Sequence, residues 1–162
     1  MKIYQDNEFN KIICEVSNNK EFQKLKKVKH HGINRYEHSV RVAYYTYKIT
    51  KILHLDYKES TIAALLHDFF QEEVSDKNFI VRLRKHPGIA VKNATQYFKL
   101  NEKQIDIIKT HMFPITFTPP KYMEGWIVDF VDDASAIFEQ GRVIKQHVKI
   151  VGTFLLILLL RH

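Results

Sequence analysis

The sequence has few of the residues that build turns, disulfides and secretion signals. It contains 5 glycines and 4 prolines among 162 residues, too few for a turn-rich β architecture, so helices are favoured. The single cysteine, Cys14, cannot form an internal disulfide, which suits a reducing compartment. The first residues lack the apolar stretch of a secretory signal. We therefore expect one cytoplasmic domain that is long enough to bury its own core.

The sequence also lacks an apolar run long enough to cross a membrane. Residues 150–160 are almost purely apolar, but a helix of that length reaches only about 17 Å, whereas a span needs about 20 residues. A buried terminal helix or a dimer contact is the favoured interpretation, ahead of peripheral membrane contact. The sequence is compatible with either a monomer or a homodimer.

The charge is unbalanced towards positive, with a formal net charge of +7. A basic protein suits nucleic acid, but it equally suits small anionic substrates such as nucleotides. The densest basic run, residues 20–29, lacks the alternating aromatic residues typical of a single-strand binding surface. A solvated helix face explains this run better, so nucleic acid is not an expected partner.

Three polar residues mark predicted helix starts. Asn34 precedes an amphipathic stretch, and the pairs Asp56 with Glu59 and Asn101 with Gln104 have the spacing of a capping box. Each pair stands just before apolar residues that recur at helical spacing. These patterns predict helices that begin near residues 35, 57 and 102.

The remaining patterns complete an all-α fold. Pro87 suits the first turn of a helix running to about Phe98, and three prolines make residues 113–120 a loop. A last helical pattern begins near Met123 and continues past Gly141. We predict a single-domain bundle of about seven or eight helices over residues 1–162, with a motif core at about 34–139 and a C-terminal apolar helix at 140–162.

Four residues form the pattern that points to chemistry. His67 and Asp68 end an apolar helical run, where a buried aspartate is costly unless it is paired or binds a metal. His38 lies 29 residues before His67, and Asp132 lies 64 residues after Asp68 in another apolar helix. Antiparallel packing would bring the four together. Two imidazoles and two carboxylates suit Mn, Fe, Mg or Zn.

These residues resemble the signature of the HD superfamily, which is a histidine, a His-Asp pair and a distant aspartate. The match lies in residues 36–43, 63–68 and 131–132. His86 before Pro87, and His111 within residues 110–114, resemble the two extra histidines of the binuclear branch of that superfamily. The resemblance covers about residues 34–139, and it is closest to small bacterial HD proteins described as phosphohydrolases.

The resemblance implies a site with two divalent ions per chain. Asp68 would bridge the ions, His38, His67 and Asp132 would complete one, and His86 and His111 would complete the other. Fe, Mn, Mg and Zn all remain open. Asp129 and Asp133 are rivals for the position of Asp132, and Asp129 could instead orient a ligand histidine.

The implied reaction is hydrolysis of a phosphate ester or anhydride by a metal-bridging hydroxide. The substrate would be a small phosphate compound, such as a nucleotide or a dinucleoside polyphosphate. Arg35 and Lys109 are the candidates to position the phosphate, because each stands close in sequence to a ligand histidine.

One position departs from the single-metal HD hydrolases, in which an acid three residues after the metal-binding aspartate helps to activate water. Here that position is Gln71, which cannot take a proton, although Glu72 follows it. The departure favours a two-metal site and disfavours alarmone hydrolysis. Two alternatives remain, namely a di-iron oxygenase and, with less support, a nucleotide sensor without catalysis.

We predict that freshly purified protein contains two divalent metal ions per chain. Replacing His86 or His111 with alanine should lower the count towards one, because each supplies a ligand to the second ion only. Elemental analysis of the protein measures the count. A single ion in the wild-type protein that survives both substitutions would contradict the two-metal interpretation.

Overall fold

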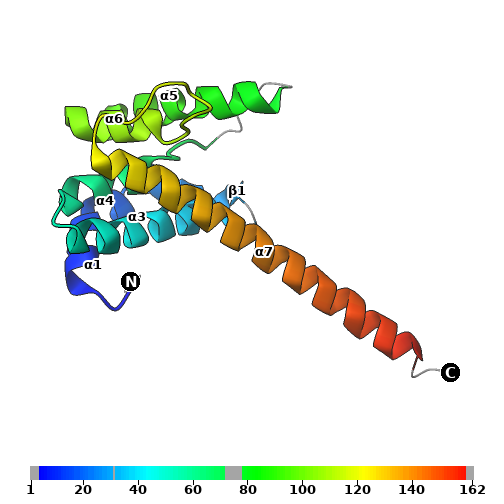
Figure 1. The fold of residues 1–162 in the computed structure, drawn as a ribbon. Coiled ribbons are helices and arrows are strands. Elements are labelled where there is room, and N and C mark those ends of the chain that lie inside the picture. Colours follow the sequence, from blue (N-terminus) through cyan, green and yellow to red (C-terminus); the bar gives the residue numbers. More distant parts are fainter. Residues whose placement is uncertain (1–3, 31, 72–77, 160–162) are drawn as a thin grey trace.

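The computed structural model describes residues 4–30, 32–71 and 78–159, and this part of the chain contains seven α-helices (Figure 1). Their bounds are α1 Asn7–Asn18, α2 Lys20–Gln23, α3 Arg35–Ile52, α4 Tyr57–Leu66, α5 Phe79–Tyr97, α6 Glu102–Thr110 and α7 Met123–Leu159. A 3-10 helix, η1 (Lys24–Lys27), follows α2. The predicted all-α bundle is therefore confirmed.

A two-stranded antiparallel ladder precedes α3 and was not predicted. It pairs β1 (Lys29–His30) with β2 (Ile33–Asn34). The lysines of the basic run are exposed, as expected, but the run is divided among α2, η1 and β1. The sequence pattern missed this division because each piece is too short to show a period.

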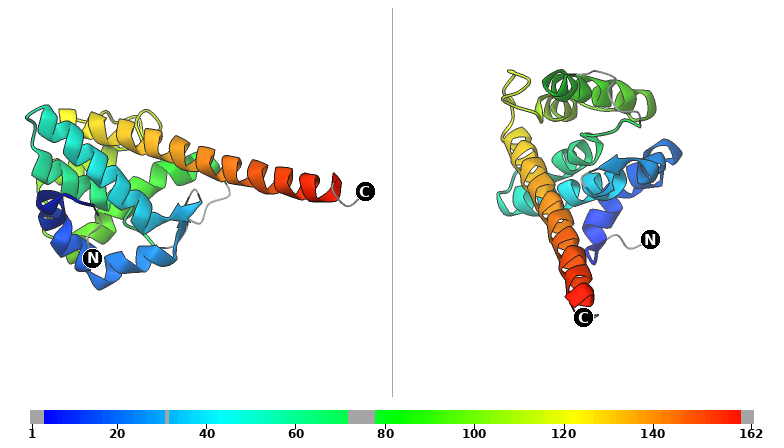
Figure 2. Two further views of the ribbon diagram at one scale, coloured as in Figure 1. Left: turned by 90° about the horizontal axis from the view of Figure 1, so that it is seen from below. Right: turned by 90° about the vertical axis from the view of Figure 1, so that its right-hand side faces the viewer.

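Helices α3 and α4 occupy the centre of the bundle. α3 packs against α4 and α7, while α4 also contacts α1 and α6. α5 lies beside α6, and the two form a layer on one side of the molecule (Figure 1). α7 crosses the bundle, and its C-terminal part extends beyond every other element in both views of Figure 2.

The predicted helix starts are confirmed. The Asn34 side chain accepts a hydrogen bond from the Glu37 amide at 2.9 Å, and Asn101 with Gln104 forms a complete capping box. Asp56 also caps its helix, but its own amide donates to Glu124 of α7 at 3.1 Å. This bond ties the start of α4 to the start of α7.

The predicted start of α5 at Pro87 is wrong. The helix begins eight residues earlier, at Phe79, where the Asn78 side chain accepts from the amides of Ile80 and Val81. Pro87 therefore lies inside the helix, where it lacks the N–H that would bond one turn back. Residues 79–86 contain no glycine or proline, so the Asn78 cap can start the helix there. His86 is consequently held on a helix and not in a loop.

The core is built around α4. Its last four residues, Ala63 to Leu66, are fully buried, and they lead directly to His67. Large apolar side chains from the neighbouring helices surround them, including Phe9 of α1, Tyr47 of α3 and Ile107 of α6. Burial of the last turn of α4 on all sides fixes the position of the residues that follow it.

α7 is one continuous helix through Gly141, as predicted. The side chains from residue 142 onwards lie outside the described residues, so the packing of the apolar segment 150–160 does too. Among the residues that the structure describes, no helix combines the length and the apolar character that crossing a membrane requires.

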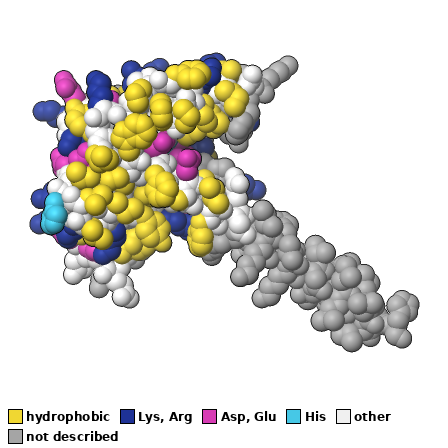
Figure 3. Space-filling model, viewed as in Figure 1, with side chains coloured by type: hydrophobic (Ala, Val, Ile, Leu, Met, Phe, Trp, Pro, Cys, Tyr) yellow, Lys and Arg dark blue, Asp and Glu magenta, His cyan; other side chains and the backbone are white. Residues whose placement is uncertain are grey.

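An apolar groove lies where α7 crosses α3. Its volume is about 280 Å³, and its lining includes Tyr45, Ile49, Phe130 and Phe138. Hydrophobic side chains are plentiful on the face drawn in Figure 3, and three of these lining residues are exposed.

Two glycines of α7 provide a matched test of the packing between α7 and the loop before it. A Cβ at Gly125 would lie 2.7 Å from Cβ of Pro120, whereas a Cβ at Gly141 would meet nothing within 4 Å. We expect Gly125→Ala to destabilise the protein by about 1–3 kcal/mol. Gly141→Ala should be neutral or stabilise by up to about 1 kcal/mol, because alanine favours the helix. Urea denaturation measures both, and equal effects of the two would refute this packing.

Candidate metal centre

The structure brings the six predicted ligand residues together from five parts of the fold. His38 lies in the first turn of α3, His67 and Asp68 directly follow α4, His86 lies within α5, His111 follows α6, and Asp132 lies within α7. Five of these residues are buried, and the Asp132 side chain is 14% exposed. We refer to these six residues as the histidine cluster.

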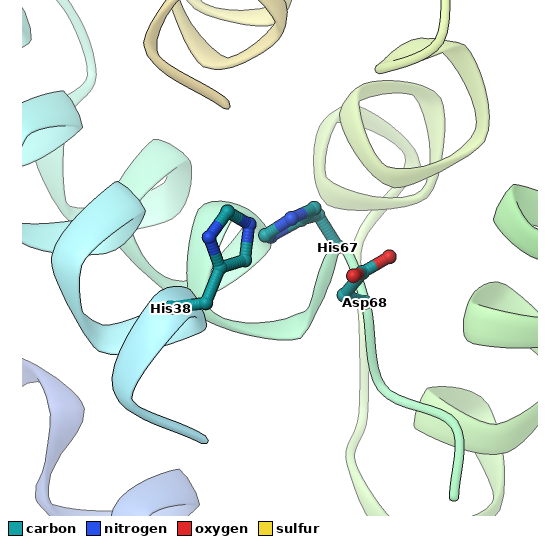
Figure 4. A group of neighbouring side chains, drawn as sticks. All are labelled: His38, His67 and Asp68. Carbon is teal, nitrogen blue, oxygen red and sulfur yellow. The ribbon is translucent and has the colours of Figure 1, made fainter. Parts of the chain in front are cut away.

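One half of the cluster joins α3, α4 and α7 through Asp132. Its Oδ1 atom lies 2.8 Å from Nε2 of His38 and 3.4 Å from Nε2 of His67. In Figure 4 the His38 ring approaches the His67 ring, and the two ring centroids are 5.4 Å apart. A single carboxylate oxygen thus faces two imidazole nitrogens.

The other half joins α5 and α6 through Asp68. Nε2 of His86 and Nε2 of His111 are 2.9 Å apart. Oδ1 of Asp68 lies 3.5 Å from the first nitrogen and 4.0 Å from the second. In Figure 4 the Asp68 carboxylate extends away from His38.

Backbone carbonyls orient two of the imidazoles. Nδ1 of His67 donates to the Ala64 carbonyl, and Nδ1 of His111 donates to the Ile108 carbonyl, both at 2.7 Å. Each histidine follows the last turn of a helix, where carbonyls lack an intrahelical partner. The bonds leave the Nε2 lone pairs facing the cluster, which is the arrangement that metal-binding histidines need.

The cluster fits divalent metal ions. Three groups have ligand atoms within 4.8 Å of one another: His38, His67, Asp68; His67, His111, Asp132; and Asp68, His86, His111. Nε2 of His67 is buried and makes no hydrogen bond. A buried nitrogen without a partner costs free energy, and a bound metal ion would remove that cost. Neutral imidazoles and carboxylates are ordinary ligands for such ions.

The comparison with protein families agrees with this geometry. The sequence model of the HD domain matches residues 35–151, which is most of the chain. The chain belongs to the HD domain family. HD domains form a superfamily of metal-dependent phosphohydrolases. No match was found among curated proteins or among solved structures.

The first half of the HD site holds charge. Burial alone would lower the pKa of His38, but Asp132 and Glu139 outweigh it and raise the pKa to about 10. Partial burial would raise the pKa of the Asp132 carboxyl, but His67 and His38 outweigh it and hold the pKa well below the ordinary value. Without metal, His38 and Asp132 therefore form an ion pair. A metal ion would have to displace that proton.

The second half of the HD site is neutral. Burial lowers the pKa of His86, and burial together with the neighbouring His86 and His67 lowers the pKa of His111 to about 3. Both imidazoles are therefore neutral at neutral pH, each with a single N–H. They need lose no proton before they bind a metal.

The rivals of Asp132 are placed differently. Asp133 is exposed as a residue, but partial loss of water around its carboxyl, together with the charge of Asp132, raises its pKa. Burial, Asp133 and Asp132 raise the pKa of Asp129 to about 7. Of the three, Asp132 is the one whose carboxylate lies beside the histidines, at the distances given above. The geometry therefore favours Asp132 as the last ligand.

The two residues predicted to position phosphate differ in their surroundings. Arg35 is buried, its Nε lies 3.5 Å from Oδ2 of Asp68, and its Nη1 donates to the Phe70 carbonyl at 2.7 Å. Its guanidinium also stacks on the Phe70 ring at 3.9 Å. Lys109 instead lies on the exposed side of α6, so its role stays a prediction from sequence alone.

Gln71 faces away from the HD site. It is exposed, and its Nε2 donates to Glu21 of α2 at 3.0 Å. Glu72, the other candidate for an activating acid, lies outside the described residues.

Glu139 contacts the HD site, and the sequence interpretation did not include it. It is buried on α7, and its Oε2 lies 3.0 Å from Nδ1 of His38. It stands seven residues after Asp132, which places both on one face of the helix. That spacing was the signal that could have found it.

We expect the pH dependence of stability to reveal the neutral half of the site. The pKa of His111 falls from an ordinary 6.5 to about 3 in the folded protein, so the unfolded chain takes up this proton first. As pH falls from 6.5 to 5, metal-free wild-type protein should lose about 1–2 kcal/mol more stability than His111→Asn. Denaturation in the presence of a chelator measures this, with exposed His54→Asn as the control. Parallel curves for wild type and His111→Asn would contradict it.

Proposed function

We propose that this HD protein hydrolyses a phosphate ester or anhydride in a small molecule, such as a nucleotide or a dinucleoside polyphosphate. The observation that supports this most strongly is the position of Asp68. Its carboxylate lies 3.5 Å from Nε2 of His86 and 4.0 Å from Nε2 of His111, and it belongs to two of the three possible metal-binding groups, one with these histidines and one with His38 and His67. Such a placement is what a carboxylate shared by two metal ions requires.

The residues would divide between two ions. His38, His67 and Asp132 would hold one, and His86 and His111 would hold the other, with Asp68 shared. Divalent ions at such a site lower the pKa of bound water and offset charge on phosphate oxygens. The ligand types do not select among Fe, Mn, Mg and Zn.

The protein's own part is to hold Asp68 and to balance charge beside it. Arg35 faces Oδ2 of Asp68, while Oδ1 faces His86 and His111, so the two oxygens have separate partners. A guanidinium at this place also suits an anionic substrate, because its forked donors match phosphate oxygens. We assign Arg35 both tasks, orienting Asp68 and attracting the phosphate.

The position of Gln71 supports the two-metal reaction over the single-metal one. A side-chain base after Asp68 would have to face the cluster, but Gln71 carries no basic group and its amide bonds to Glu21. The activation of water would then depend on the metal ions and not on a side-chain carboxylate at this position.

The test is phosphate release by metal-loaded protein. We expect Asp68→Asn to lower kcat by about 1000-fold or more, because the shared ligand loses its charge. Gln71→Ala should stay within about threefold of wild type, because its amide contacts α2 instead of the site. Released phosphate is measured over a panel of nucleotides and dinucleoside polyphosphates with Mn²⁺, Fe²⁺, Mg²⁺ or Zn²⁺. Wild-type protein that contains metal but is inert to the whole panel would refute the proposal.

A further inference from the structure

A buried carboxylate stands behind His38, on the side away from the cluster. Nε2 of His38 faces Asp132 at 2.8 Å, and Nδ1 faces Oε2 of Glu139 at 3.0 Å. Glu139 is 1% exposed. It belongs to none of the three groups that could hold a metal ion, and it meets the cluster at Nδ1 of His38.

The second oxygen of Glu139 has a partner of its own. Nη1 of Arg41 donates to Oε1, and Arg41 lies three residues after His38 on α3. The side chains of His38 and Arg41 therefore leave the same face of α3 and meet one carboxylate of α7. A carboxylate held from two sides has little freedom to turn, so it fixes the direction of the His38 ring.

A histidine that binds a metal through one nitrogen commonly donates the other N–H to a carboxylate or carbonyl. Backbone carbonyls do this for His67 and His111. His38 lies at the start of its helix, where the backbone carbonyls already accept hydrogen bonds within the helix. The Nδ1–H of His38 therefore needs a side chain as its acceptor. Glu139 is the side chain in that position.

We propose that Glu139, held by Arg41, is a positioning residue for His38. It keeps the proton on Nδ1 and presents the Nε2 lone pair to a metal ion. The inference rests on the proposed metal centre, but it does not depend on which reaction that centre performs.

Zinc binding by the full-length protein tests the inference without reference to catalysis. The apparent dissociation constant for Zn²⁺ is measured by competition with a chromophoric chelator. We expect Glu139→Ala to weaken Zn²⁺ binding by about 10–100-fold. Glu139→Gln keeps an acceptor oxygen but loses the charge, so it should weaken binding by about threefold or more.

Glu124 supplies the matched control. It is a buried glutamate on the same helix, and its partners are Lys103, at 3.1 Å, and the amide of Asp56 at the start of α4. Glu124→Ala should lower stability and leave Zn²⁺ affinity unchanged. Nitrogen-15 NMR of the zinc-loaded protein adds a second measurement. The Nδ1–H form of His38 should be retained in Glu124→Ala and lost or mixed in Glu139→Ala.

The outcomes separate cleanly. Folded Glu139→Ala with wild-type Zn²⁺ affinity and an unchanged His38 tautomer would overturn the inference, as would a wild-type protein that binds no Zn²⁺. If Glu139→Ala does not fold, Glu139→Gln decides: weaker binding supports the inference and unchanged affinity overturns it. Protein that binds Zn²⁺ but releases no phosphate would refute the proposed function alone.

Discussion

The burial of ionisable side chains at the meeting point of the helices is the constraint on which this structure depends. Four imidazoles and two carboxylates lie in or at the edge of the core, where an unpaired charge is costly. Most of these groups gain a partner only because helices distant in sequence meet at one place. The core must therefore be rigid enough to keep the partners in contact, and the last turn of α4, whose four residues Ala63 to Leu66 are fully buried, supplies that rigidity.

The two halves of the cluster differ in how they avoid an unpaired buried charge. On the side of α3 and α7, carboxylates and imidazoles pair as opposite charges, with His38 between Asp132 and Glu139. On the side of α5 and α6, burial keeps His86 and His111 neutral, and Arg35 balances the charge of Asp68. The adjacent residues His67 and Asp68 join the two halves, so the charge balance of both halves depends on the segment that directly follows α4.

Helix ends place most of the groups that matter. His67 and His111 each follow a helix and donate to a carbonyl of its last turn, which satisfies both the carbonyl and the ring. Arg35 and His38 lie in the first turn of α3, which the Asn34 cap starts. The caps therefore matter for the site as well as for the helices, because they fix which residue occupies each position of the helix. A shift of the sequence by one residue along the helix would turn these side chains by about 100°.

The sequence by itself determined the all-α class, the starts of three helices and the six residues that meet. Caps, apolar periodicity and the His-Asp pair at the end of an apolar run are local signals, and each of them depends on residues close together in the chain. The resemblance to the HD superfamily added His86 and His111. Only the tertiary structure decided that Asp132 and not Asp129 faces His38, that Arg35 contacts Asp68, and that Glu139 stands behind His38. These depend on how α7 crosses α3, a contact between residues about a hundred positions apart that no local pattern records. The start of α5 was misjudged for a different, local reason: the Asn78 cap starts the helix eight residues before Pro87, which the helix interior accommodates.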